Sequence, residues 1–197
     1  MDNENQEISR DNKNIARYVA DVFGGDPRVV EFRNDSETMS MGILSSRDWP
    51  NEGLTSFSTV GLSDHSMKWK DGEFPTRIEL VGVCITSAEY YPNVLASAAF
   101  TIMLDDAVYH PGTVISGLVR QHYEDTDLPH LYLTSPVLWS DELGTHDFDT
   151  KKVSWLMAIP MSQSEYEYLR ENGEEALEKL WAEEAIDFAD PDRQAAI

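Results

Sequence analysis

Histidines and carboxylates are the first residues to examine for chemistry, because together they can bind a metal ion or transfer a proton. The five histidines are His65, His110, His122, His130 and His146. No two of them have the spacing of three or four residues that metal sites commonly use. Two groups nevertheless combine a histidine with nearby carboxylates: His122 with Glu124, Asp125 and Asp127, and His146 with Asp147 and Asp149. Solvated loop side chains explain the same pattern, and we expect neither a metal nor a cofactor.

Nucleophilic catalysis has two candidate residues, Ser63 and Cys84. The run Ser63-Asp64-His65 places serine, acid and base side by side, but neighbours on a strand point to opposite faces and cannot form a relay. Cys84 is the only cysteine, and it stands in an apolar run where burial raises the pKa of a thiol. The common phosphate-binding, zinc-protease and serine-hydrolase signatures are absent. We therefore expect a protein that is not an enzyme, with a metal-dependent hydrolase as the catalytic alternative.

The charge of the chain is its strongest collective feature. Thirty-six acidic residues stand against fifteen basic ones, which gives a formal net charge of −21. Such a field repels nucleic acid phosphates and anionic membrane surfaces, and it attracts basic proteins. We expect a protein partner with a basic surface and no nucleic acid or membrane partner. A role in solubility alone is the alternative explanation of the same charge.

Two acidic loops are the candidate partner-binding residues. They comprise Glu124, Asp125, Asp127, Asp141, Glu142, Asp147 and Asp149. With the outer face of the last helices they are candidates for one continuous negative surface, which would speed association with a basic partner and select it by matched charge pairs. A solvated face without a partner is the alternative.

The length of 197 residues suits one domain with a sizeable core. We expect a flexible N-terminus over residues 1–8, a single domain over 9–193 and a flexible C-terminus over 194–197. The N-terminal residues lack the apolar stretch of a signal peptide, and no apolar run approaches the roughly 18 residues of a membrane span. A cytoplasmic location is therefore expected.

Hydrophobic periodicity predicts an α+β fold, with a mixed and mainly antiparallel sheet covered by helices. The first half should contain a helix from Ser9 or Asp11 to Phe23, a hairpin of strands Val29–Phe32 and Met39–Leu44, a strand Phe57–Ser63, and a buried strand Ile78–Ile85 exposed at Glu79 and Gly82. The Ala-rich segment that opens at Tyr91-Pro92 predicts a buried central helix through Met103.

The second half begins with a short strand predicted over Val114–Val119. The apolar run Val153–Pro160 then predicts a strand buried on both faces and ended by its proline. Ser162 and Glu165 have the spacing of a capping box, which opens a helix. Asn172-Gly173 should interrupt that helix before a second helical stretch, Glu174–Ala185.

Six short motifs occur in an order that resembles the Suppressor of fused-like domain family. They are Thr59-Val60-Gly61-Leu62-Ser63, Glu79-Leu80-Val81, the Ala-rich helix Val94–Met103, Pro111-Gly112, Pro160-Met161-Ser162 followed by Glu165, and Asp190-Pro191-Asp192-Arg193. The resemblance covers residues 15–193. The family carries no catalytic constellation, so the resemblance assigns no catalytic residue.

Stand-alone single-domain members of this family are typical of bacteria. There the resemblance implies an immunity protein, or antitoxin, that neutralises a cognate secreted toxin by direct binding. Some of these toxins are nucleases with an LXG-type export domain. A general regulatory protein-binding module without a toxin partner is the alternative that the residues themselves leave open.

Overall fold

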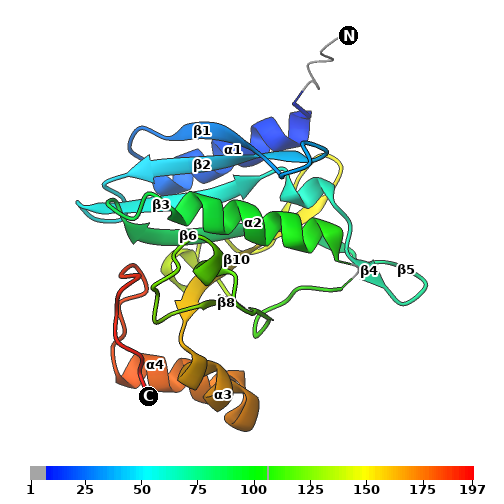
Figure 1. Cartoon of the computed structure of the whole chain (residues 1–197). Coiled ribbons are helices and arrows are strands. Elements are labelled where there is room, and N and C mark those ends of the chain that lie inside the picture. The colour runs from blue at the N-terminus through cyan, green and yellow to red at the C-terminus, as the bar shows by residue number, and fades with distance from the viewer. Residues whose placement is uncertain (1–7, 106) are drawn as a thin grey trace.

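A sheet lies at the centre of the molecule, with one helix on each face (Figure 1). The computed structural model of the chain describes residues 8–105 and 107–197, so residues 1–7 of the expected flexible N-terminus lie outside the described residues. Within that part of the chain, eight strands form the sheet in the order β1-β2-β3-β6-β10-β8-β7, and β9 pairs with β10. The predicted α+β class is confirmed.

The bounds of the elements are as follows. The sheet contains β1 (Arg28–Arg33), β2 (Ser40–Arg47), β3 (Leu54–Val60), β6 (Thr76–Ile85), β7 (Val114–Ile115), β8 (His130–Thr134), β9 (His146–Asp147) and β10 (Lys152–Met161), and a separate hairpin is made by β4 (Lys68–Trp69) and β5 (Gly72–Glu73). The helices are α1 (Arg10–Phe23), α2 (Tyr91–Leu104), α3 (Gln163–Asn172) and α4 (Glu174–Glu183), with 3₁₀ turns at Leu62–Asp64, Val119–Gln121 and Val137–Trp139.

Strand β10 is the spine of the sheet. It pairs in parallel with β6 and antiparallel with β8, while the other pairs in the sheet are antiparallel. Its side chains alternate between two cores: Trp155 and Met157 face α1, and Leu156 and Ala158 face α2. The prediction of a strand buried on both faces is therefore confirmed.

The two helices that cover the sheet, α1 and α2, differ in how much of their surface is buried. Helix α1 buries the single stripe Ile15, Val19 and Phe23 and leaves its other side in solvent. Helix α2 is apolar on most sides and buried along most of its length. At its start the Tyr91 hydroxyl donates to the Ala158 carbonyl at 2.8 Å, which fixes the helix on β10.

The predicted exposure of Glu79 and Gly82 is wrong, because both residues are buried. A Cβ on Gly82 would clash with the Tyr91 hydroxyl, so the helix is seated directly on this strand position. Glu79 is 0% exposed and accepts four hydrogen bonds: from Thr59 Oγ1 at 2.5 Å, Gly61 N at 2.9 Å, and Ser63 N and Oγ at 3.1 and 2.6 Å.

The turn at Gly61 explains why the donors gather around Glu79. It also shows that the predicted strand Phe57–Ser63 is too long. Strand β3 ends at Val60, and Gly61 adopts φ +113°, a left-handed conformation that glycine tolerates best. The chain therefore leaves the sheet before Ser63 instead of continuing as a strand to that residue. The predicted strand Val114–Val119 is likewise shorter, since β7 ends at Ile115.

Replacing Glu79 by Gln should lower the free energy of unfolding by about 2–4 kcal/mol, because the new amide group would place a donor against N–H and O–H donors in a buried site. Chemical denaturation measures this change. Glu89→Gln, at an exposed position, is the matched control and should stay within about 0.5 kcal/mol of the wild type. Equal stability of the two variants would contradict the Glu79 cluster.

Candidate functional site

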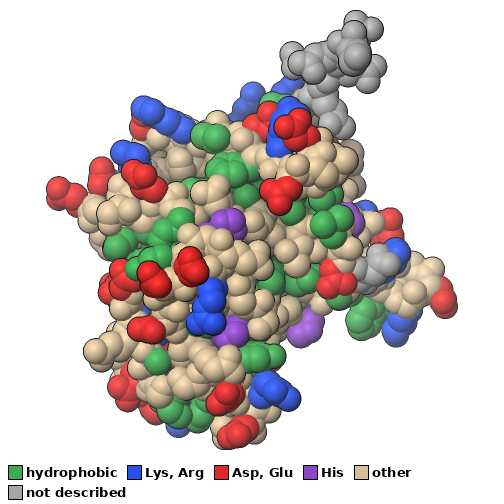
Figure 2. Space-filling view, viewed as in Figure 1, with side chains coloured by type: hydrophobic (Ala, Val, Ile, Leu, Met, Phe, Trp, Pro, Cys, Tyr) green, Lys and Arg blue, Asp and Glu red, His purple; other side chains and the backbone are tan. Residues whose placement is uncertain are grey.

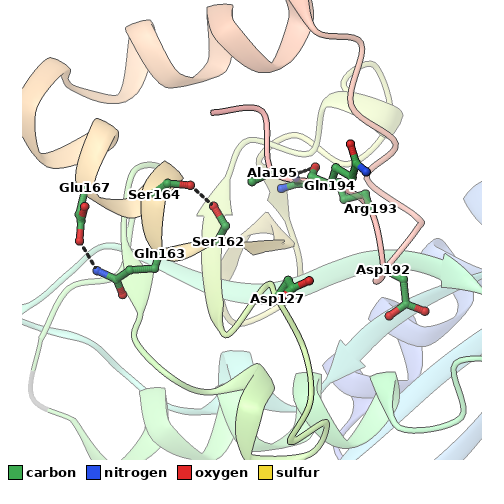
Figure 3. Close-up of a pocket in the computed structure, with 9 residues that line it drawn as sticks. All are labelled: Asp127, Ser162, Gln163, Ser164, Glu167, Asp192, Arg193, Gln194 and Ala195. Carbon is green, nitrogen blue, oxygen red and sulfur yellow. Dashed lines mark hydrogen bonds between the residues drawn. The ribbon is translucent and has the colours of Figure 1, made fainter.

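A hollow of about 550 Å³ lies where α3 begins, beside the loop that precedes β8 and the C-terminal tail (Figure 3). We call it the acidic pocket. Its lining residues are Asp127, Ser162, Gln163, Ser164, Glu167, Asp192, Arg193, Gln194 and Ala195. They come from segments far apart in the sequence, which the end of β10 brings together.

Three carboxylates set the charge of the acidic pocket. Asp127 comes from the loop before β8, Glu167 from α3, and Asp192 from the tail. Gln163 Nε2 donates to Glu167 Oε1 at 2.8 Å, and this bond orients that carboxylate. Arg193 is the one basic residue of the lining, and its guanidinium is bound internally by Glu165. The pocket therefore suits a cationic group of a partner, such as a lysine or arginine side chain.

A buried ion pair holds the acidic pocket in shape. Arg193 makes a two-pronged contact with Glu165, at 2.7 Å to Oε1 and 3.0 Å to Oε2, and also donates to the Pro160 carbonyl at 3.0 Å. Trp181 Nε1 donates to the same carboxylate at 3.0 Å. Glu165 therefore ties together β10, α3, α4 and the tail.

The predicted capping box is part of this cluster. The Ser162 side chain accepts from the Glu165 N–H at 3.1 Å, and Glu165 Oε2 accepts from the Ser162 N–H at 2.8 Å. The last residues, 194–197, contact the same helix end: the Ala196 N–H donates to Glu165 Oε1 at 3.0 Å, and Ser164 Oγ donates to the Ile197 carbonyl at 2.6 Å.

Burial alone would raise the pKa of Glu165, but its bonds to Arg193 and to the N–H groups of Ser162 and Ala196 hold that pKa below the ordinary value of 4.5. A carboxyl whose pKa is lowered by folding stabilises the protein above its unfolded pKa. That contribution is lost as the pH falls through the folded pKa, so the contact between Glu165 and Arg193 weakens in acid.

The first predicted loop lies at the acidic pocket. Glu124, Asp125 and Asp127 are exposed, and none of them forms an ion pair within the described part of the chain. Tyr123 donates to Asp192 Oδ1 at 2.9 Å, and this bond raises the pKa of the Tyr123 hydroxyl; the charges of Asp192, Asp125 and Asp127 add to the effect. Asp127 and Asp192 also line the acidic pocket itself.

The second predicted loop runs along α1 instead. Asp141, Glu142, Asp147 and Asp149 are all exposed. Asp149 pairs with Arg10 at 3.1 Å and Asp147 with Lys152 at 3.5 Å. Asp141 and Glu142 form no ion pair with any described residue.

Aromatic stacking fixes this second loop. The Tyr18 ring stacks on His146 at a centroid distance of 4.6 Å, and the Tyr18 hydroxyl donates to the Glu142 carbonyl. Leu143 is fully buried beneath the loop. The loop therefore presents its carboxylates from a fixed backbone.

The structure does not bring the two loops together. Asp147 pairs with Lys152, the first residue of β10, whereas Asp127 lies beside Ser162, just beyond its last residue. The nine steps between the ends of this strand span roughly 30 Å. Figure 2 shows acidic side chains over α3, α4 and the tail, with apolar side chains between them.

Sequence reasoning missed two carboxylates of the acidic pocket, Glu167 and Asp192. Their signal was present in the segments that carry them, the helix opened by the capping box and the Asp190–Arg193 motif. Neither segment reveals from sequence that the tail folds back onto the start of α3, because that contact depends on the buried Glu165–Arg193 pair.

The residues considered for catalysis have other contacts. Ser63 Oγ donates to Glu79, and burial raises the pKa of Cys84 to about 12. His122 Nε2 lies 2.8 Å from Ser97 Oγ, and burial lowers the pKa of this histidine. Over residues 8–105 and 107–197, no three side chains of His, Cys, Asp and Glu are arranged to hold a metal ion.

Comparison with known proteins decides the family. The model of the Suppressor of fused protein (SUFU) family matches residues 37–194. The chain belongs to the SUFU family. This SUFU chain is also 36% identical over 190 residues to Immunity protein YqcF of Bacillus subtilis (strain 168), a match that covers 96% of the chain and 99% of that protein.

Solved structures share the fold of this SUFU chain. A SUFU homolog from Neisseria gonorrhoeae FA 1090 superposes with a TM-score of 0.71 at 15% identity, over 95% of this chain and 97% of that one. Drosophila Suppressor of Fused gives a TM-score of 0.67 at 15% identity and matches all of this chain over 54% of its own length. None of the helices described here is long and apolar enough to span a bilayer.

Replacing Arg193 by Met should cost about 3–5 kcal/mol of unfolding free energy at neutral pH, because Glu165 would keep a buried charge without its partner. The loss should shrink as the pH is lowered, since protonation of Glu165 removes that charge. Denaturation curves measured from pH 7 to pH 4 test both statements. Arg170→Met, at an exposed position on α3, is the control, and a pH-independent loss in Arg193→Met would contradict the assignment.

Proposed function

We propose that this SUFU chain is an immunity protein that neutralises a cognate protein toxin by direct, non-catalytic binding. The observation that carries the proposal is the 36% identity to Immunity protein YqcF over nearly the full length of both chains. A relation of that extent makes a shared role the simplest inference, because the match covers 96% of this chain and 99% of that protein.

The acidic pocket supports a binding role. The carboxylates of Glu167 and Asp192 are held by hydrogen bonds to neighbouring groups, and the arginine in its lining is bound internally by Glu165. A basic side chain of a toxin would find a preorganised site there, at little cost in ordering the protein. The net charge of −21 adds long-range attraction for a basic toxin.

The nature of the toxin is the finer part of the proposal. Nucleases need cationic clefts to bind phosphate, so an acidic inhibitor matches a nuclease toxin in charge. The same charge disfavours binding of this chain to nucleic acid. We place the encounter in the cytoplasm of the producing cell, where an intracellular nuclease would meet its substrate.

Co-expression with the product of the neighbouring gene tests the immunity role. We expect growth to be rescued and the two proteins to purify together, with an affinity that falls as the salt concentration rises because the contact is electrostatic. Failure of both rescue and co-purification would refute the proposal.

Removing negative charges from the loop that contains Glu124, Asp125 and Asp127 should weaken that complex. We expect Asp125→Asn with Asp127→Asn to reduce affinity about tenfold or more, mainly through slower association. Binding kinetics measured by surface plasmon resonance at two salt concentrations provide the readout. The control Asp35→Asn with Asp71→Asn removes the same number of exposed charges elsewhere and should change affinity less than threefold. Equal effects of the two pairs of substitutions would place the interface outside the loop of Glu124, Asp125 and Asp127.

Asp141→Asn with Glu142→Gln tests the second loop in the same assay. Because this loop lies along α1 and away from the acidic pocket, we expect a smaller decrease in association rate and an unchanged dissociation rate. A larger effect than that of the Asp125 and Asp127 pair would move the principal interface to α1.

A further inference from the structure

An apolar groove of about 320 Å³ lies between α4 and the end of β8. It is separate from the acidic pocket and shares none of its lining residues. The groove is lined by Thr134, Val137, Ile159, Glu178, Trp181, Ala182, Ala185, Ile186 and Phe188. Seven of these nine side chains are apolar, so the groove offers an apolar floor in an otherwise acidic chain.

One wall of the groove is formed by the 3₁₀ turn Val137–Trp139, and two of its apolar side chains are exposed to solvent. Val137 is 51% exposed, and Leu138 beside it is 45% exposed. Ala182 and Ala185 on the opposite wall are also exposed. Adjacent apolar side chains left in solvent in this way mark an interaction surface more often than scattered single ones do.

The backbone at the end of α4, which forms part of the groove wall, adopts a conformation that is unfavourable for alanine. Ala185 has φ +50°, in the left-handed region. The Ile186 N–H donates to the Trp181 carbonyl at 3.1 Å, and the Ala185 N–H donates to the Ala182 carbonyl at 3.3 Å. This is a Schellman motif in which the residue after the C-cap is usually glycine. Alanine there costs stability but adds a methyl group to the groove.

The segment that contains α4 and the residues after it is acidic. Residues 174–192 contain eight acidic residues and one basic residue, and that base, Lys179, pairs with Glu183 at 3.6 Å. Glu178 stands in the lining itself, where its carboxylate accepts from Thr134 Oγ1 at 2.5 Å and from the Tyr132 hydroxyl at 3.1 Å. A fixed carboxylate therefore stands next to an apolar floor.

We propose that this groove binds an apolar side chain of the toxin that is flanked by lysine or arginine. The inference rests on the proposed immunity function and adds the chemistry of an anchor. The apolar side chain fills the space between Val137 and Ala182, and its basic neighbour meets Glu178 at the rim. Charge complementarity argues against a second copy of this chain as the occupant, since its own acidic rim would meet the same rim.

Two variants test the groove with the co-expressed toxin as the probe. Val137→Ser should weaken binding about tenfold through faster dissociation, with the salt dependence unchanged, because apolar anchors act after encounter. Val30→Ser is the matched control, since Val30 on β1 is 55% exposed, and its affinity should stay within twofold of the wild type. Ala185→Gly should raise the melting temperature while it weakens binding two- to fivefold, a combination that loss of folding cannot produce.

A photo-crosslinking residue in place of Leu138 identifies the occupant. We expect crosslinks to a toxin peptide whose apolar residue lies within three positions of lysine or arginine. Crosslinks between two copies of this chain, or wild-type affinity in both Val137→Ser and Ala185→Gly, would overturn the groove while the immunity role stands. Absence of any toxin binding by the wild type would instead refute the immunity role and the groove together.

Discussion

The buried pair of Glu165 and Arg193 is the interaction on which both concave surfaces of the molecule depend. Arg193 lines the acidic pocket, and Trp181, which donates to the same carboxylate, lines the apolar groove. One cluster therefore sets the position of a wall in each concave surface. An ion pair in the interior gains little over well-packed apolar side chains, and what the structure shows of this one is that it links β10, α3, α4 and the tail.

A second buried carboxylate, that of Glu79 on β6, also holds separate segments of the chain together. Glu79 forms no ion pair with any described residue, and its carboxylate accepts hydrogen bonds from Thr59, Gly61 and Ser63. The two clusters give the motifs of the SUFU family a physical meaning. The T-x-G-L-S run provides the donors for Glu79, while the capping box and the final arginine provide those for Glu165. Residues that look like separate signatures in the sequence are thus contacts within two sites.

Local features of the fold were predictable, and long-range ones were not. The first helix, the buried run that forms β10 and the capping box at Ser162 each depend on neighbours a few residues away, and all three are confirmed. Glu79 was wrongly expected in solvent because its donors come from a turn about twenty residues earlier. The acidic pocket was found only in part, since Asp192 and Asp127 line one pocket only when the tail folds back onto the start of α3.

The distribution of charge and apolar surface would let one small domain combine fast and lasting association with the proposed toxin. Exposed carboxylates attract a basic partner over distance, but salt screens them and they hold it weakly. An apolar side chain seated in a groove adds little to the encounter and much to the lifetime of the complex. The start of α3 and the tail line most of the acidic pocket, and α4 with the residues after it lines most of the groove. Glu165 connects these segments through Arg193 and Trp181. A partner that engages either one therefore meets the other in a fixed position, and most of the ordering has already occurred when the chain folds.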